Sequence, residues 1–405
     1  MNIKETDNKK TSRSIASEGG RWAHIAMLCL LMLCWLLTAF YFLVSKPSDY
    51  SVAERRKLAV APTLTYASVK NGTWLSGMEA YTKDHFPERE LFRNLKTGSS
   101  FYGFFRLQDK GYAILQDHLA KMDMTLNPGS VNYACSQMQY IYDSLLSESN
   151  CNIYYCAIPD KNYYLHQADA SYPVLDYDAL DLMLKEQLSF ATPIDIRKDL
   201  SLSSFYLTDT HWRQDALIPA ASSILSAMTA ASVKEEFFTP QTALTSFDGV
   251  LCGNMGWNLL SDPLLYLTND TIASAYVTHL EGMDCHSVYD EKYLTYRGPG
   301  ADPYSFFLSG ATAFVTIEKD ASATAMGTGA NTSGRELVVF RDSFGSSIAP
   351  LFLSQYDKIT LIDTRYINPA LISSYITFTD QDVLFLYSTL LLNNSFSLKA
   401  PANSR

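Results

Sequence analysis

Apolar residues follow three different patterns along the chain, and the first is a continuous run near its start. Residues 25–44 read IAMLCLLMLCWLLTAFYFLV and contain no charged side chain. An α-helix rises about 1.5 Å per residue, so this run spans about 30 Å, the thickness of the hydrocarbon core of a bilayer. Trp22 and Tyr41 lie near its ends, where amphipathic rings favour the membrane interface. The pattern predicts one transmembrane helix, with residues 22–44 as the anchor.

The apolar run has two other interpretations. A cleaved signal peptide usually has a shorter apolar region and a small-residue cleavage site, and the following sequence SKPSDYSVAERRK contains no A-x-A site. A buried core helix is seldom apolar on every face. Before the run, five Lys and Arg residues outnumber three Asp and Glu residues, which predicts that the N-terminus stays in the cytoplasm. Residues 1–21 are then a cytoplasmic tail, and the chain after the anchor lies outside the membrane.

The second pattern is an alternation of short apolar runs with amphipathic stretches. Residues 45–70, with Pro47 and mixed charge, predict an extended stalk, and residues 71–398 predict one domain. Near-continuous Val, Ile, Leu and Phe are typical of strands covered on both faces, and strands alternating with helices favour an α/β fold with a parallel sheet. The predicted strands are 152–159, 192–196, 337–340, 358–367 and 382–389, and the predicted helices are 73–107 (broken at Pro87), 130–148, 176–190, 213–231, 347–356 and 368–376.

The third pattern covers residues 240–335, where Gly and aromatic residues are frequent and the apolar runs are short. It predicts an antiparallel, β-rich insertion that ends in a loop of small residues at 321–335. A further loop is expected at 160–166, DKNYYLH, directly after the first predicted strand of the domain. We find no internal repeat.

Composition and charge exclude several classes of protein. The chain has 405 residues, of which 47% are hydrophobic, so it is neither a disordered chain nor a small disulfide scaffold. Its formal net charge of −10 provides no positive field for a nucleic-acid backbone, and no nucleic-acid partner is expected. Five cysteines lie outside the apolar run, and their pairing cannot be read from the sequence. Neither a CxxC nor an HExxH pattern occurs, so the sequence predicts no metal site.

Two short segments contain the residues best suited to chemistry. In RDSFG, residues 341–345, Ser343 follows a predicted buried strand and precedes a helix, which is where open α/β sheets build their sites. A serine hydroxyl needs a base, and DTHW, residues 209–212, offers His211. Asp209 lies two residues before this histidine, so one loop can present both side chains, with the carboxylate fixing the tautomer of the imidazole. These residues predict a Ser-His-Asp triad.

Each of the three residues also has a purely structural interpretation. Ser343 could be the N-cap of the helix that follows it, since serine is common at that position. His211 could be an ordinary surface histidine. Asp209 could cap a helix that begins near Trp212. The residue chemistry alone leaves these interpretations open.

Seven segments occur in a characteristic order along the chain: SVAERRKLA with Pro62, YTKDHFPERELFR, AIPDKNYYL, DTHW, RDSFG, ITLIDTRYI and DVLFLYSTLLLNNS. Taken in this order, they resemble the DHHW protein family, which is similar to the SGNH hydrolase-like alginate O-acetyltransferases. The resemblance implies an SGNH-like three-layer α/β/α sandwich and a catalytic set of Asp209, His211 and Ser343, in that order along the chain. The first motif departs from the family pattern at its second residue, because DTHW replaces DHHW.

The group that stabilises the oxyanion is left open, because the usual SGNH Gly and Asn donors have no clear match. The backbone N–H of Ser343 is the first candidate, with Arg341 or Arg365 as electrostatic help. Lys161 lies at the end of a predicted strand, near the expected edge of the site, and is a candidate substrate contact. The remaining candidate donors are Asn393, Gly249, Gly253 and Asn254.

The triad and the resemblance together predict a membrane-anchored, extracytoplasmic serine O-acetyltransferase that modifies a cell-surface polysaccharide. Acyl transfer through an ester of serine needs no metal or organic cofactor. The acetyl donor must reach the outside of the cell, and the resemblance implies a multi-spanning membrane O-acyltransferase as the partner that supplies it. Two alternatives stay open. One is a carbohydrate esterase with the same triad, and the other is a non-catalytic envelope or spore-surface scaffold that binds glycans.

Overall fold

The structure, a computed structural model, describes residues 4–44, 48–280, 285–296, 300–320 and 334–401. The chain divides into two compact units. The first contains Met1–Ser51 and Arg56–Phe92, and the second contains Val52–Arg55 and Arg93–Arg405. Four residues of the segment predicted as a stalk therefore belong to the second unit. The predicted small-residue loop lies outside the described residues over 321–333.

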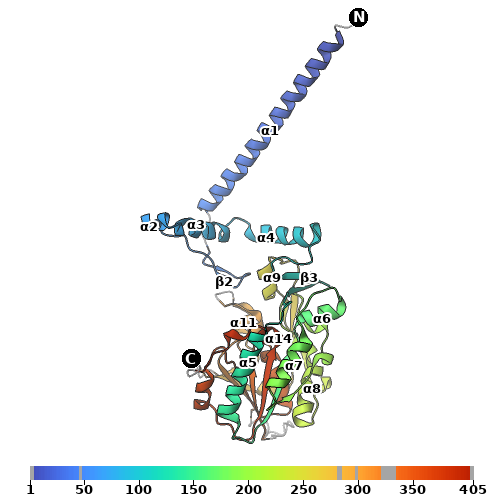
Figure 1. The fold of residues 1–405 in the computed structure, drawn as a ribbon, viewed down its shortest axis with the longest axis vertical. Coiled ribbons are helices and arrows are strands. Elements are labelled where there is room, and N and C mark those ends of the chain that lie inside the picture. Colours follow the sequence, from blue (N-terminus) through green and yellow to red (C-terminus); the bar gives the residue numbers. More distant parts are fainter. Residues whose placement is uncertain (1–3, 45–47, 281–284, 297–299, 321–333, 402–405) are drawn as a thin grey trace. The chain divides into compact units, whose positions relative to one another are not determined.

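The first unit consists mainly of helices (Figure 1). Helix α1, Lys4–Val44, includes an apolar stretch, Arg21–Phe42, that contains no buried residue and is long enough to cross a membrane. One N-terminal apolar helix of this kind fits a signal anchor and also fits a signal peptide. The helical region that follows is interrupted at Pro87, as predicted, because proline cannot continue a helix ladder. The other elements are β1 (Tyr50–Ser51), β2 (Arg56–Lys57), α2 (Tyr66–Lys70), α3 (Thr73–Asp84) and α4 (Arg89–Gly98, which continues into the second unit).

The second unit is organised around an eight-stranded sheet in the order β10-β9-β11-β13-β12-β14-β5-β6. Five neighbouring strands, β13, β12, β14, β5 and β6, run parallel to one another. The other three, β11, β9 and β10, pair antiparallel. The predicted parallel sheet is confirmed. The strands are β5 (Asn152–Ile158), β6 (Thr192–Pro193), β9 (Tyr276–His279), β10 (Cys285–Ser287), β11 (Phe314–Glu318), β12 (Glu336–Arg341), β13 (Lys358–Ile362) and β14 (Asp382–Ser388).

Alternate residues of the central strands face two separate cores. On β12, Leu337 and Val339 belong to one core, and Val338 and Phe340 belong to the other. The first core is completed by α8 (Ile218–Thr229), α13 (Gly345–Ile348) and the 3-10 helix η8 (Ala349–Ser354). The second is completed by α5 (Pro128–Ile141) and α7 (Tyr177–Gln187). Helices thus cover both faces of the sheet in the three-layer α/β/α arrangement predicted from the sequence (Figure 1).

The structure differs from the sequence prediction in three local features. The prediction of a loop at 160–166 is wrong, because this segment forms helix α6, Lys161–Ala168, with Asp160 as its N-cap. Within the predicted β-rich insertion, β9, β10 and β11 extend the main sheet, while β7 (Thr239–Phe247) and β8 (Asp262–Thr268) form a separate antiparallel pair. The predicted helix at 368–376 is the 3-10 helix η9, Pro369–Ser374.

The smaller elements of the second unit connect the main layers. A hairpin of β3 and β4 precedes α5, which ends in a π-helical turn. These elements are η1 (Ser99–Gly103), β3 (Tyr112–Leu115), β4 (His118–Lys121), η2 (Tyr142–Leu146), η3 (Arg197–Asp199), η4 (Leu202–Ser204), η5 (Gln214–Ala216), η6 (Glu235–Phe237), α9 (Val250–Met255), α10 (Asp270–Ser274), α11 (Lys292–Thr295), η7 (Pro303–Phe306), α14 (Thr389–Leu392) and η10 (Ser395–Ser397).

Candidate active site

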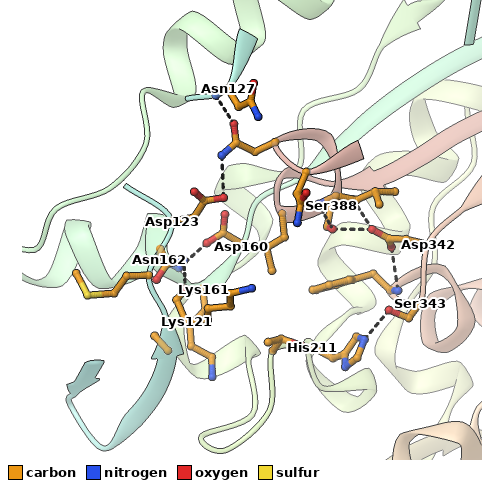
Figure 2. Close-up of a pocket in the computed structure, with 18 of the residues that line it drawn as sticks. Lys121, Asp123, Asn127, Asp160, Lys161, Asn162, His211, Asp342, Ser343 and Ser388 are labelled. Carbon is orange, nitrogen blue, oxygen red and sulfur yellow. Dashed lines mark hydrogen bonds between the residues drawn. The ribbon is translucent and has the colours of Figure 1, made fainter. Parts of the chain in front are cut away.

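A cavity of about 840 Å³ opens in the second unit where the parallel strands reach their carboxyl ends. The chain leaves β5 at Asp160, β12 at Asp342 and β14 at Ser388, and all three residues line this cavity. Crevices at this edge of an open α/β sheet are the usual place for a binding site. Ser343 and His211 also line the cavity and face each other across a short gap (Figure 2).

The structure brings Ser343, His211 and Asp209 into one hydrogen-bonded chain. His211 Nε2 lies 2.7 Å from Ser343 Oγ, and His211 Nδ1 lies 2.6 Å from Asp209 Oδ1. When the Nδ1 proton is donated to the carboxylate, Nε2 is left to accept the serine hydroxyl proton. The arrangement therefore has the geometry needed to activate a serine hydroxyl.

The electrostatics of Asp209 favour its ionised form. Burial is the largest influence and opposes ionisation, but the charge and hydrogen bond of His211 hold the pKa of Asp209 well below its usual range. The backbone N–H of Val250 donates to Asp209 Oδ2 over 2.8 Å and adds to this effect. A carboxylate that stays ionised at neutral pH can fix the tautomer of the imidazole beside it.

A buried polar network holds the loop that carries Asp209. The carboxylate of Asp262 accepts the N–H groups of Leu207, over 2.7 Å, and Thr208, over 2.8 Å. The N–H of Gly249 donates to Thr208 Oγ1 over 2.9 Å. At Gly249 the chain passes so close to this loop that an added Cβ would lie 2.3 Å from the carbonyl group of Thr208. Only glycine allows this approach.

We predict that Gly249→Ala lowers kcat/KM for the expected acyl transfer by about a hundredfold, since a shift of about 1 Å in a reactive group such as the Asp209 carboxylate has that effect. The new methyl group must push the Thr208–Asp209 backbone away from α9. The free energy of unfolding should also fall by about 1–3 kcal/mol, as for other overpacked sites. Steady-state kinetics and urea unfolding measure both quantities. Gly103→Ala is the matched control, because a Cβ at Gly103 meets no atom within 4 Å. Equal activities of the two variants would contradict the packing argument.

The turn that presents Ser343 is fixed by the carboxylate of Asp342. Its Oδ1 accepts the N–H of Phe344 over 3.0 Å, and its Oδ2 accepts the N–H and hydroxyl of Ser388 over 2.9 and 2.6 Å. Asp342 thereby ties the end of β12 to the end of β14. Among the hydrogen bonds of the described residues, the N–H of Ser343 has no partner, which leaves it available to an oxyanion. The sequence analysis missed Asp342, although Asp directly before a turn residue is a typical Asx-turn signal.

Aromatic residues fix the orientation of the His211 ring. The ring of Tyr304 stacks on it with centroids 3.9 Å apart and an interplanar angle of 10°. Tyr304 is itself held by a hydrogen bond from its hydroxyl to Ser347 Oγ, over 2.8 Å. The next residue of the DTHW segment, Trp212, donates its Nε1–H to the carbonyl oxygen of Phe344 over 3.1 Å. The histidine loop is therefore attached directly to the serine turn.

Lys161, predicted as a substrate contact, is buried in the wall of the cavity and binds backbone carbonyl groups. Its ammonium donates to the carbonyl oxygens of Asp209, over 2.6 Å, Leu119, over 2.8 Å, and Leu207, over 3.4 Å. Burial lowers the pKa of Lys161 to about 8, while the nearby carboxylates of Asp209 and Asp262 oppose the shift. The geometry favours a positioning role for this side chain, which supports the backbone at Asp209.

We predict that Lys161→Met lowers kcat/KM between about tenfold and a hundredfold, because the Asp209 loop loses its support. The unfolded chain holds this proton up to a pH of about 10, but the folded chain releases it near 8, so wild-type stability should rise with pH across this window. The variant should lack that rise. Urea unfolding at both pH values measures it, with the exposed Lys185→Met as control. The same pH dependence of the unfolding free energy in both variants would contradict the assignment of the rise to Lys161.

The other three side chains predicted at the site, Asn393, Arg365 and Arg341, differ in their partners and in whether they line the cavity. Asn393 lines the cavity, but its amide nitrogen donates to Asp123 Oδ2 over 2.8 Å and to the carbonyl of Thr125 over 3.0 Å, so it shapes the wall. Arg365 also lines the cavity, and its guanidinium is paired with Asp363 at 2.6 Å. Arg341 is fully buried, 3.6 Å from the same carboxylate, and does not line the described cavity. Of these three side chains, Arg365 alone offers charge at the cavity surface.

We next consider metal ligands and disulfides among the described residues of the second unit. Among them, no group of three or more His, Cys, Asp or Glu side chains is arranged to hold a metal ion. Four cysteines of the second unit, Cys135, Cys151, Cys156 and Cys252, have free thiols, so none of them pairs with another of the four.

The fold and the site together define an SGNH-like α/β protein with a serine–histidine–aspartate cluster. A DHHW family protein from Eubacterium siraeum shares the fold with a TM-score of 0.54 and 20% identity, over 72% of this chain and 95% of the other. Bacillus cereus PatB1, solved with a sulfonyl adduct, matches with a TM-score of 0.51 and 17% identity, over 69% and 95%. The O-acetyltransferase domain of Pseudomonas putida AlgJ matches with a TM-score of 0.40 and 10% identity, over 73% and 95%.

No family model matches the sequence, and a search of curated proteins found no match. The resemblance to the DHHW family noted from the sequence is thus supported by the similarity of the folds. The two matches with TM-scores above 0.5 show the fold of this chain and do not show its chemistry.

Proposed function

We propose that this protein is a serine acyltransferase that acts outside the cytoplasm and transfers an acyl group, most simply acetyl, to a hydroxyl of a cell-surface polysaccharide. The observation that supports it most strongly is the hydrogen-bonded chain from Ser343 Oγ through His211 to Asp209. An Nε2 atom 2.7 Å from the hydroxyl is within the reach needed for direct proton transfer. Asp209 completes the chain as the group that orients the imidazole.

The reaction has two matching halves. His211 Nε2 takes the proton of Ser343 while Oγ forms a bond to the carbonyl carbon of the donor, and the donor leaving group departs with that proton. The acceptor hydroxyl then gives its proton to His211 as its oxygen attacks the serine ester. The ester bond breaks, and Ser343 Oγ recovers the proton. The free N–H of Ser343 is the donor we assign to the oxyanion that forms in each half.

The cavity and the N-terminal helix support the proposed setting. A volume of about 840 Å³, lined by polar and apolar side chains, has room for a sugar unit as well as an acyl donor. As an anchor, the Arg21–Phe42 stretch would keep the enzyme beside a multi-spanning membrane protein that supplies the acyl group, by raising the effective concentration of each for the other. The sulfonyl adduct recorded for PatB1 suggests a useful probe, because sulfonyl fluorides label activated serines.

This function is tested by incubating the full chain in detergent with an activated acetyl ester, with and without an envelope oligosaccharide. We expect acetylated sugar to appear, together with a matching decrease in free acetate. Acetate release that is unaffected by the sugar would identify an esterase instead. Failure of a sulfonyl fluoride to label Ser343, together with no turnover of the ester, would favour a non-catalytic scaffold. Mass spectrometry of the sugar and of the labelled peptide separates the three outcomes.

A further inference from the structure

Helix α4 is oriented with its polar side toward the body of the second unit and its apolar side toward solvent. Arg93 forms an ion pair with Glu54 at 2.6 Å. Asn94 Oδ1 accepts the N–H of Asn258 over 2.8 Å, and Thr97 donates its hydroxyl to the carbonyl of Met255 over 2.7 Å. A surface helix normally has the opposite orientation, with apolar residues inside. The inversion leaves an apolar face that the described residues of the second unit do not cover.

The exposed apolar residues continue into the segment after α4. Leu95 is 63% exposed on the helix, and beyond the π-helical turn η1 the exposed fractions are 74% for Phe104, 82% for Phe105 and 86% for Leu107. We refer to these four residues as the apolar patch. Single exposed apolar side chains are common, but several large ones gathered in one short segment mark a binding surface. The patch lies in the same unit as the cavity.

Basic side chains accompany the apolar patch. Lys96 and Arg106 have exposed side chains, with 57% and 58% of their surface accessible, and both approach Asp109, at 3.6 and 3.7 Å. Lys110 lies beside Lys96, and the hydrogen bond and charge of Lys96 lower the pKa of Lys110. Three cations around one carboxylate leave a net positive rim. Aromatic and aliphatic groups with a basic rim are the combination that binds anionic membrane interfaces.

We propose that the apolar patch inserts into the interface of a lipid bilayer, with Lys96, Arg106 and Lys110 facing anionic headgroups. The occupant is lipid because the same chain carries the Arg21–Phe42 helix, which on insertion would hold the patch at a high effective concentration of bilayer. The charge of the rim complements an anionic surface. The inference goes beyond the proposed acyl transfer and rests only on the proposed anchor. It makes the membrane a second support for the catalytic body.

Photo-crosslinking of the full chain in vesicles tests this surface. Benzoylphenylalanine is introduced at Phe105, and the protein is reconstituted in phosphatidylcholine vesicles with and without phosphatidylglycerol. Irradiation should give lipid adducts at this position, increased severalfold by the anionic lipid. Phe237, which is 54% exposed on η6, is the matched control and should give few. Lys96→Glu with Arg106→Glu should abolish the increase caused by phosphatidylglycerol.

Flotation of the vesicles separates failure of the anchor from failure of the patch. A chain that floats with the vesicles but forms no lipid adduct at Phe105, or equal amounts at Phe105 and Phe237, contradicts the patch and leaves the anchor intact. Crosslinked dimers in place of lipid adducts would identify a second copy as the occupant and overturn the inference. A chain that does not float contradicts the anchor and the patch together. Acyl transfer measured in detergent is independent of all these outcomes.

Discussion

Ser343→Ala is expected to lower kcat for acyl transfer by about a millionfold, the loss seen when a serine nucleophile is removed from a complete triad. Without Oγ no ester of the protein can form, and the only catalysis left comes from binding and from the oxyanion donor. The fold should be unaffected, because the substitution removes one hydrogen bond at the edge of a cavity. Thermal unfolding should therefore be almost unchanged, which separates a chemical defect from a structural one.

Ser346→Ala is the matched control for this prediction. Ser346 lies three residues after Ser343, in the adjoining helix α13, and is buried, with 2% of its surface exposed, so it tests the effect of losing a hydroxyl in this segment. We expect it to retain activity. Stopped-flow and steady-state assays with an activated acetyl ester measure both variants. Wild-type activity in Ser343→Ala would show that the hydrogen-bonded serine is a structural turn residue.

Asp209→Asn is expected to lower kcat by about ten thousandfold, because an amide favours the wrong tautomer of the histidine. The amide also cannot accept from both His211 Nδ1 and the Val250 N–H as the carboxylate does. The effect should appear in kcat with little change in KM, since Asp209 is buried and does not line the cavity. Asp178→Asn, on the exposed side of α7, is the control.

The pH dependence of unfolding tests the state of Asp209 independently of activity. Its pKa is lowered in the folded protein, so its contribution to stability is complete above the pKa of about 4 in the unfolded chain and is lost as the pH falls further. The difference in unfolding free energy between wild type and Asp209→Asn should therefore narrow below pH of about 4. Urea unfolding between neutral and acidic pH measures it. A difference that is constant across this range would contradict the ionised, partnered carboxylate.

Much of the central sheet could be predicted from local sequence. The strands β5, β12, β13 and β14 are near-continuous apolar runs, and their burial on both faces follows from that composition. Helix α6 was missed because its sequence, KNYYLHQA, has no clear apolar face. Its position is decided by tertiary contacts, since Tyr164 packs into the core and Lys161 reaches three carbonyl groups.

The candidate site was predictable where the chemistry resides in a short motif. DTHW and RDSFG name the three members of the cluster, and the structure brings them within hydrogen-bonding distance, although their catalytic role stays a prediction. Tyr304 and Asp262 were missed, since nothing in their own neighbourhoods shows that they contact the histidine loop. Such supports are set by contacts between residues distant in the sequence, which a single chain read in order does not display.

The proposed acyl-serine is the most direct test of the central claim. The full chain is mixed with an activated acetyl ester, quenched in acid during the first turnover, digested, and analysed by mass spectrometry. The account predicts one added acetyl group on the peptide that contains Ser343, absent from Ser343→Ala and lost from wild type when oligosaccharide is added. An acetyl group on another residue, or no acetylated peptide while the ester is still consumed, would contradict it.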